Sequence, residues 1–173
     1  FAEIAGLFDT VYVSFYKDLA APAGAALAGP KDVIDEARIW QVRHGGRFYT
    51  AHPFLIAAER GLDELLPRMP EFVARARELG AALAELASVS VVPDPPQTAM
   101  FHLHVRLPLE QLEEAALDLA ERTKTFLGFF RPTEIPDVQR VELTIGAASL
   151  EVPVDQALTL WTELLAEAQR AAS

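Results

Sequence analysis

The hydrophobic and polar positions along the chain predict short strands and amphipathic helices. Residues 10–15 (TVYVSF) are mostly β-branched or aromatic and contain no breaker, which is typical of a buried strand. A second short apolar run, at 25–28, lies between two turn sequences, 22–24 and 29–30, that contain proline and glycine. Residues 1–8 read as the last turns of a helix that leads into the first strand.

Apolar residues recur at helical spacing in the later segments. The predicted helices are 31–42, a tail within 48–66, a long helix from Pro70, 108–125 and a last helix from Pro153. Each has one apolar stripe and one charged face, so each is expected to pack through one side. The stripe of the first is Val33, Ala37 and Trp40, and that of the long helix is Phe72, Ala76, Leu79, Leu83 and Leu86.

Strand-like segments are interleaved with these helices in the second half of the chain. We predict strands at 88–92, 98–106 and 138–145, a further short strand at 127–130, and an extended connection at 93–96. The order strand, strand, helix, strand, helix has no long crossover. It favours an α/β fold whose small, mostly antiparallel sheet is covered by helices on one face.

Composition restricts the possible partners and surroundings. The chain has 173 residues, 15 Lys and Arg against 25 Asp and Glu, a net charge of -10, and no basic cluster along the sequence, which argues against nucleic acid as a partner. It has no cysteine, no apolar run of membrane-spanning length and no signal-peptide start. We therefore expect a cytoplasmic protein with no membrane partner.

One lysine stands out as a candidate for chemistry. Lys17 follows directly on the predicted first strand and precedes small residues, so a flat ligand would have room beside it. Partial desolvation at a strand end would favour the neutral, nucleophilic amine, which can bond covalently to an aldehyde. Most lysines that follow a strand are solvated, however, and the local pattern alone favours that interpretation.

Two histidines are the other candidates from spacing. His102 and His104 are two residues apart on a predicted strand, so both side chains lie on the same face. That spacing suits a metal pair, but no third ligand is evident in the sequence. We predict a partly exposed sheet face and no metal site.

Three segments resemble one known family. The stretch VSFYKDLAAPAGAALAG, which contains Lys17, resembles the pyridoxal-phosphate lysine segment of the threonine aldolase and β-eliminating lyase family, typically S-x-x-K-G-L-G-A-P-x-G. Asp18 and Ala20 stand where the family usually has glycine. Residues 43–47 (RHGGR) resemble the family's glycine-rich turn, and 93–102 (PDPPQTAMFH) resemble the entry to its small domain.

The resemblance implies a fold of the pyridoxal-phosphate-dependent transferase type, known as fold type I. Residues 1–68 would be the end of the large cofactor-binding domain and 69–173 the small α/β domain, so the chain reads as the C-terminal part of a larger enzyme. The implied cofactor is pyridoxal 5'-phosphate. The implied catalytic residue is Lys17, and the implied cofactor-binding residues are Lys17, Ser14, Arg47 and His44. For Arg47 and His44, the alternative is that they belong to a plain helix C-cap.

In sequence, Arg140 lies near the position at which the family has an arginine that binds the substrate α-carboxylate. The family's Arg-x-x-Thr-His reads here as RVELTI from Arg140, one residue out of step and without the histidine. A one-residue offset reverses the face of a strand. Either a bulge compensates, or Arg140 pairs with Glu142 and another arginine, such as Arg131, binds the carboxylate.

The implied activity is aldol cleavage of β-hydroxy-α-amino acids, such as threonine or allo-threonine, to glycine and an aldehyde. A small amino-acid substrate and a homodimer or homotetramer are expected, because Arg47 would reach a neighbouring subunit's cofactor. Two alternatives remain open. One is a non-catalytic fragment or dimerisation module, and the other is a related lyase, racemase or transaminase on the same fold.

Overall fold

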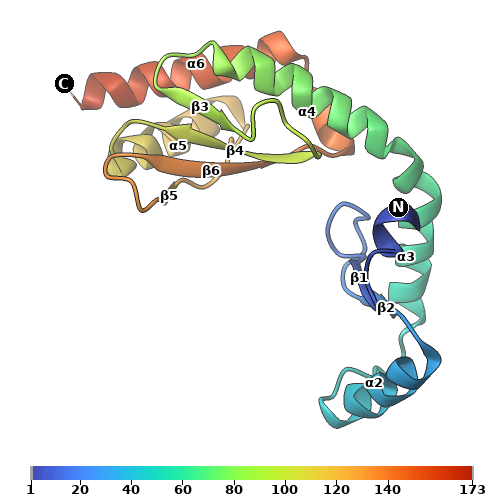
Figure 1. Cartoon of the computed structure of the whole chain (residues 1–173). Coiled ribbons are helices and arrows are strands. Elements are labelled where there is room, and N and C mark those ends of the chain that lie inside the picture. The colour runs from blue at the N-terminus through green and yellow to red at the C-terminus, as the bar shows by residue number, and fades with distance from the viewer. Residues whose placement is uncertain (1, 173) are drawn as a thin grey trace. The chain divides into compact units, whose positions relative to one another are not determined.

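The computed structural model describes residues 2–172. Its contacts divide the chain into two compact units, Phe1–Arg68 and Met69–Ser173, which we call the first and second units and describe separately. Figure 1 shows the helices and strands of each. No helix among the described residues is long and apolar enough to cross a membrane.

The first unit contains one hairpin and several helices. Strands β1 (Val11–Ser14) and β2 (Ala25–Ala28) pair antiparallel, with Val11 opposite Ala28 and Ser14 opposite Ala25. The helices are α1 (Ala2–Ala5), α2 (Lys31–Arg43), α3 (His52–Glu64) and the short 3-10 helix η1 (Leu66–Arg68). The predicted strand at 10–15, the second apolar run and the helix at 31–42 are therefore confirmed as elements.

The first unit buries little of its apolar surface. Its buried residues among those described are Leu19, Ala21, Ala58 and Gly61. The prediction that the first strand is buried is wrong for this chain, since Tyr12 and Val13 are 58% and 44% exposed. The predicted stripe of α2 is likewise uncovered, because that helix has no buried residue.

The second unit is a four-stranded sheet with helices. Its elements are α4 (Met69–Ala84), β3 (Val89–Val92), β4 (Met100–Val105), α5 (Leu109–Thr123), β5 (Arg131–Pro132), β6 (Gln139–Thr144), the 3-10 helix η2 (Ala147–Leu150) and α6 (Val154–Ala171). The strand order is β3-β4-β6-β5, and every neighbouring pair is antiparallel. The predicted α/β class with an antiparallel sheet is confirmed.

Buried apolar residues alternate with more exposed residues along the strands, which explains why helices cover only one face of the sheet. On β4, Phe101, Leu103 and Val105 are fully buried, whereas the two residues between them are only half-buried. The apolar stripes of α4, α5 and α6 cover the buried face, and Phe130 packs edge-on against Trp161 of α6, with ring centroids 6.3 Å apart. The opposite face carries polar side chains.

Two local predictions for this unit are wrong. Residues 127–130 form no strand; Gly128 has φ of 128°, and a Cβ there would lie 2.7 Å from Val141 Cγ2, so the backbone turns where β6 comes close. The short strand β5 begins only at Arg131. The segment 93–96 bends instead of extending, and the peptide bonds before Pro93 and Pro95 are cis.

Candidate functional site

The predicted reactive lysine lies in the connection between β1 and β2. The Ala20 N–H donates to the Lys17 carbonyl oxygen (2.9 Å), the Ala21 N–H donates to the Phe15 carbonyl (2.8 Å), and the Phe15 N–H donates to the Gly24 carbonyl (3.0 Å). Three backbone hydrogen bonds thus close a compact loop around Lys17. We call residues 15–24 the lysine loop.

A glycine of α3 holds this loop against the helix. Leu19 and Ala21 are the buried residues of the lysine loop. A Cβ built on Gly61 would lie only 2.2 Å from the Leu19 carbonyl oxygen, so the loop backbone approaches closer than any other residue type would allow. This contact was not predicted from the sequence, because nothing local pairs residues 19 and 61.

Lys17 itself is exposed, which corrects the expectation of a partly desolvated amine in this chain. The cavity next to the loop, about 310 Å³, is lined by Leu19, Ala20 and residues of α3, and Lys17 is not among its lining residues. What the loop provides is an accessible primary amine on a closed, hydrogen-bonded turn.

A tyrosine pair precedes the lysine and was also not predicted. The hydroxyl oxygens of Tyr12 and Tyr16 lie 3.2 Å apart. The hydrogen bond with Tyr16, then desolvation, raises the pKa of Tyr12 above its ordinary value. Ser14, the predicted cofactor-binding residue, lies two residues from Tyr12 at the end of β1 and is half-buried. The contact depends on the bend that follows β1, and no local pattern in the sequence indicated it.

The glycine turn after α2 forms a regular helix C-cap. His44 is the C-cap residue, Gly45 has φ of 71°, and the Gly46 and Gly45 N–H groups donate to the carbonyls of Gln41 (2.8 Å) and Val42 (3.2 Å). This pattern is a Schellman motif. Gln41 also donates from Nε2 to the Gly46 carbonyl (3.2 Å), which fixes the turn at both ends.

The cation candidates on this turn are exposed. The His44 ring stacks on Trp40 with centroids 5.5 Å apart, and Arg47 follows the turn. Among the described residues, no hydrogen bond or ion pair joins Lys17 to Arg47 or His44.

Arg140 lies on β6 in the second unit. The β4–β6 register runs without interruption from Met100 opposite Thr144 to Val105 opposite Gln139, so the compensating bulge is excluded. The suggested Arg140–Glu142 pair is not formed either; Glu142 lies 3.5 Å from His102 Nε2. Arg140 stands on the open sheet face, directly opposite His104 on one side and Arg131 on the other.

The two histidines that the sequence placed on one strand face lie on the open face of the sheet. His102 and His104 lie on the same open face, and both are half-buried. Within residues 2–172, no group of three or more His, Cys, Asp or Glu side chains is placed to hold a metal ion.

Comparison with known proteins adds a family-level similarity. The profile of the beta-eliminating lyases matches residues 1–106. An uncharacterized protein of Caenorhabditis elegans is 40% identical over 62 residues, which are 36% of this chain and 15% of that protein.

Two solved structures are similar over nearly the whole chain. A proposed L-allo-threonine aldolase from Listeria monocytogenes has a TM-score of 0.85 and 30% identity. A proposed aromatic amino acid beta-eliminating lyase/threonine aldolase from Exiguobacterium sp. 255-15 has a TM-score of 0.85 and 31% identity. The alignments cover 95% and 96% of this chain but only 46% and 47% of those chains. The chain thus spans about half the length of its structural relatives.

Proposed function

The chain belongs to the beta-eliminating lyase family, and from this premise we propose that it acts as, or within, a pyridoxal-phosphate-dependent lyase that cleaves β-hydroxy-α-amino acids. The single observation that carries the proposal is the lysine loop, in which a family-type sequence is closed by backbone hydrogen bonds around an accessible amine. We further propose that the first unit is the end of the large cofactor-binding domain and the second unit the small domain.

The residues present are chemically suited to pyridoxal phosphate. Lys17 and Arg47 are exposed, and neither forms an ion pair within the described chain, so an amine for the aldehyde and a guanidinium for the phosphate are both available. After Asp18 and Leu19, the lysine loop continues with small residues (Ala20, Ala21, Ala23 and Gly24), as the family's lysine segment does. When bound, the cofactor supplies an electron sink for the carbanion left by Cα–Cβ cleavage.

The residues of this chain would divide the remaining work. Lys17 would hold the cofactor through Nζ, and its amine would carry a proton at the substrate Cα. Ser14, Arg47 and His44 are the proposed cofactor contacts. Arg140 is the proposed partner of the substrate carboxylate although no bulge brings it into the family's register, because it is exposed on the open sheet face and a guanidinium can bind a carboxylate through two hydrogen bonds.

We also propose an oligomer, at least a homodimer. Among the described residues, Arg47 and His44 form no hydrogen bond or ion pair with Lys17, so both are available to the cofactor of a second copy. A cytoplasmic location, proposed from the absence of cysteine, agrees with this metabolic role.

The test is a spectroscopic titration followed by a turnover assay. The purified chain is mixed with pyridoxal phosphate, and the visible absorption band of the lysine-bound cofactor is followed for the natural sequence, for Lys17→Ala and for Lys124→Ala as a control on an exposed lysine. We expect the band in the first and third proteins only. Release of glycine from L-threonine and L-allo-threonine then separates aldol cleavage from racemase, transaminase or other lyase chemistry.

A second candidate function is a non-catalytic folding or dimerisation module. It is favoured by one observation, the small number of buried residues in the first unit, whose surface needs a covering partner. A chain that associates but never shows the Lys17-dependent band would support this second function and contradict the first.

A further inference from the structure

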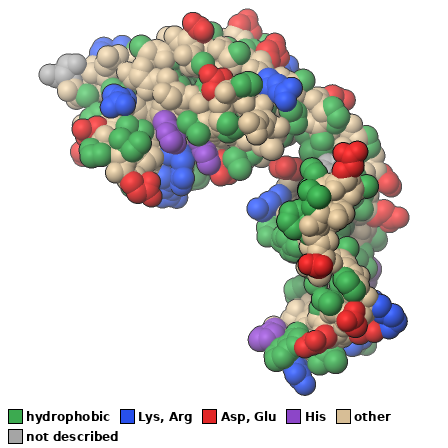
Figure 2. Space-filling model, viewed as in Figure 1, with side chains coloured by type: hydrophobic (Ala, Val, Ile, Leu, Met, Phe, Trp, Pro, Cys, Tyr) green, Lys and Arg blue, Asp and Glu red, His purple; other side chains and the backbone are tan. Residues whose placement is uncertain are grey.

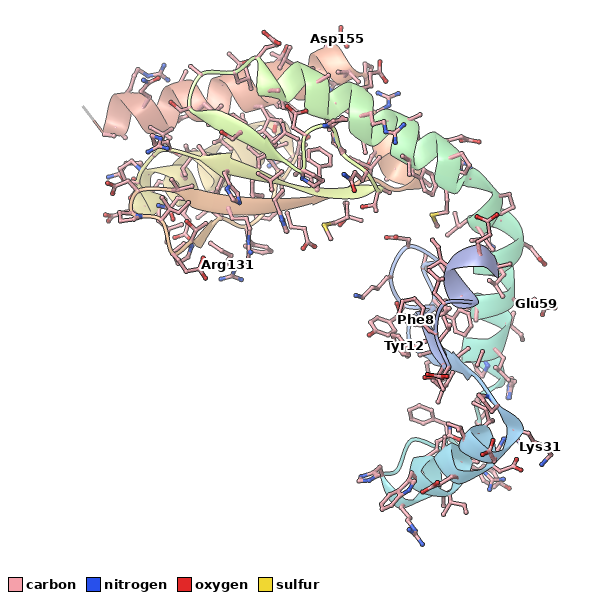
Figure 3. All side chains as sticks on the ribbon, in the orientation of Figure 1. Phe8, Tyr12, Lys31, Glu59, Arg131 and Asp155 are labelled. Atoms are coloured by element: carbon pink, nitrogen blue, oxygen red, sulfur yellow. The ribbon has the colours of Figure 1, made fainter. Side chains whose placement is uncertain are left out.

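The open face of the sheet in the second unit carries a row of cationic and imidazole side chains. His104 of β4 lies directly opposite Arg140 of β6, and Arg140 lies directly opposite Arg131 of β5. Directly opposite residues project to the same face with Cβ atoms about 5 Å apart. Figure 2 shows histidine side chains in this unit next to Lys or Arg side chains, and Figure 3 places Arg131 on the side of the sheet away from α4 and α6. We call His104, Arg140 and Arg131 the cationic row.

The row is not neutralised by the protein. Glu142, the carboxylate on the same strand face as Arg140, is engaged by His102 at 3.5 Å. Neither Arg131 nor Arg140 has an ion pair among the described residues. The guanidinium carbon of Arg131 lies 5.9 Å from the centroid of the Phe129 ring. Like charges directly opposite one another destabilise a sheet. Although the chain has 25 acidic residues, none of those described forms an ion pair with either arginine.

We propose that the cationic row is a binding site for a small dianion, either a phosphate group or a dicarboxylate. Neighbouring strands are about 4.8 Å apart, so the row spans roughly 10 Å, which matches an anion that accepts hydrogen bonds from two guanidinium groups and one imidazole. The bound anion would remove the repulsion between Arg131 and Arg140. This inference shares Arg140 with the proposed function but goes beyond it, because the dianion site requires neither Lys17 nor pyridoxal phosphate and its binding is measured without either.

The charge of the whole chain favours a small ligand. A net charge of -10 repels large polyanions such as nucleic acid, whereas a small dianion experiences mainly the local field of the row. A single monocarboxylate would contact one arginine and leave the other uncompensated. The row should therefore prefer two negative charges over one.

The experiment measures binding of inorganic phosphate, succinate and acetate at constant ionic strength, by NMR of the arginine Nε–H groups of the natural chain. We expect phosphate or succinate to bind more tightly than acetate, and the better of the two identifies the source of the dianion. Arg140→Gln and Arg131→Gln should each weaken binding by at least about tenfold. Arg170→Gln, an exposed arginine of α6 on the same unit, is the matched control and should leave binding unchanged.

A second measurement detects the repulsion without any ligand. Arg131→Gln should raise the unfolding temperature of the second unit at low salt, and the gain should shrink at high salt because the repulsion is then screened. The inference is overturned if neither dianion binds, if acetate binds as tightly as the dianions, or if the two row variants bind like Arg170→Gln.

Discussion

At the scale of single residues, Ala20 holds an unfavourable backbone conformation. Its φ is 55°, in the left-handed region that costs a residue with a Cβ about 1–2 kcal/mol. Its N–H donates to the Lys17 carbonyl, so the conformation is tied to the lysine loop. Ala20 is also one of the two positions where the sequence departs from the family's glycine, and the φ angle gives that departure a physical cost.

Ala20→Gly should therefore stabilise the first unit. The free energy gained by relieving the backbone strain exceeds the entropic cost of ordering a glycine. We expect the free energy of unfolding to rise by about 0.5–1 kcal/mol. Urea unfolding monitored by hydrogen exchange of the first unit measures it. Ala23→Gly is the matched control, since Ala23 has no positive φ and the change should lower stability by a similar amount. Equal losses from both variants would contradict the account of strain.

The tyrosine pair predicts a pH dependence. The folded pKa of Tyr12 is raised above the unfolded value of about 10, chiefly by the hydrogen bond with Tyr16. Folding therefore disfavours the tyrosinate, so the contribution to stability is present below the unfolded pKa and is lost as pH rises through the folded pKa. In Tyr16→Phe, the tyrosinate absorbance should develop at lower pH. Tyr49→Phe, which removes an isolated exposed tyrosine, should leave the Tyr12 titration unchanged.

At the scale of elements, the packing of the lysine loop on α3 depends on the absence of a side chain at Gly61. Gly61→Ala would place its Cβ 2.2 Å from the Leu19 carbonyl oxygen, so the loop backbone must move. We expect a loss of about 1–3 kcal/mol and faster hydrogen exchange at the Ala20 and Ala21 amides. Gly146→Ala, where a Cβ meets nothing within 4 Å, is the control. Unchanged exchange at those two amides would show that the loop is not held by this contact.

The elements also show how far the sequence determines the fold. The apolar stripes of α4, α5 and α6 were predictable because residues at helical spacing, such as Phe72, Leu112 and Trp161, are buried by other parts of the same chain. The apolar run of β1 correctly predicted a strand but wrongly predicted its burial. Residue type indicates that a side chain prefers to be buried, but it does not indicate which polypeptide buries it. The coil at 127–130 depends on the close approach of Gly128 to Val141, and no local pattern reports such a contact.

The candidate site also combines residues that the sequence identified with neighbours that only the fold brings together. The sequence identified Lys17, the glycine turn and Arg140 as separate motifs, because each has a local signature. It could not show that Arg131 and Arg140 stand opposite one another, since residues 104, 131 and 140 meet only through strand register. The linear sequence has no basic cluster, but strand register places Arg131 opposite Arg140.

At the scale of the whole molecule, the two units differ in how much core they have. Most large buried side chains belong to the second unit, whereas the first unit exposes Ile4, Leu7, Phe8, Tyr12 and Leu27. It also has an almost entirely apolar groove of about 400 Å³ between α1, β1 and α3, and Phe8 is among its lining residues. Contiguous exposed apolar surface of this kind is typical of an interface. The first unit is therefore where association should occur.

A charge introduced into the first unit should prevent association there. Leu27 and Phe8 are 46% and 64% exposed, on β2 and just after α1. If the first unit forms the interface, Leu27→Lys and Phe8→Lys would each bury an unpaired ammonium group there and should shift the natural chain toward monomer, as measured by sedimentation equilibrium. Ile135→Lys is the matched control, since Ile135 is 54% exposed but lies in the second unit. An oligomer dissociated only by Ile135→Lys would place the interface on the second unit, and a natural chain that is monomeric throughout would contradict self-association. Because Arg47 and His44 lie in the first unit, an interface there is also what would allow one copy to supply cofactor contacts to another.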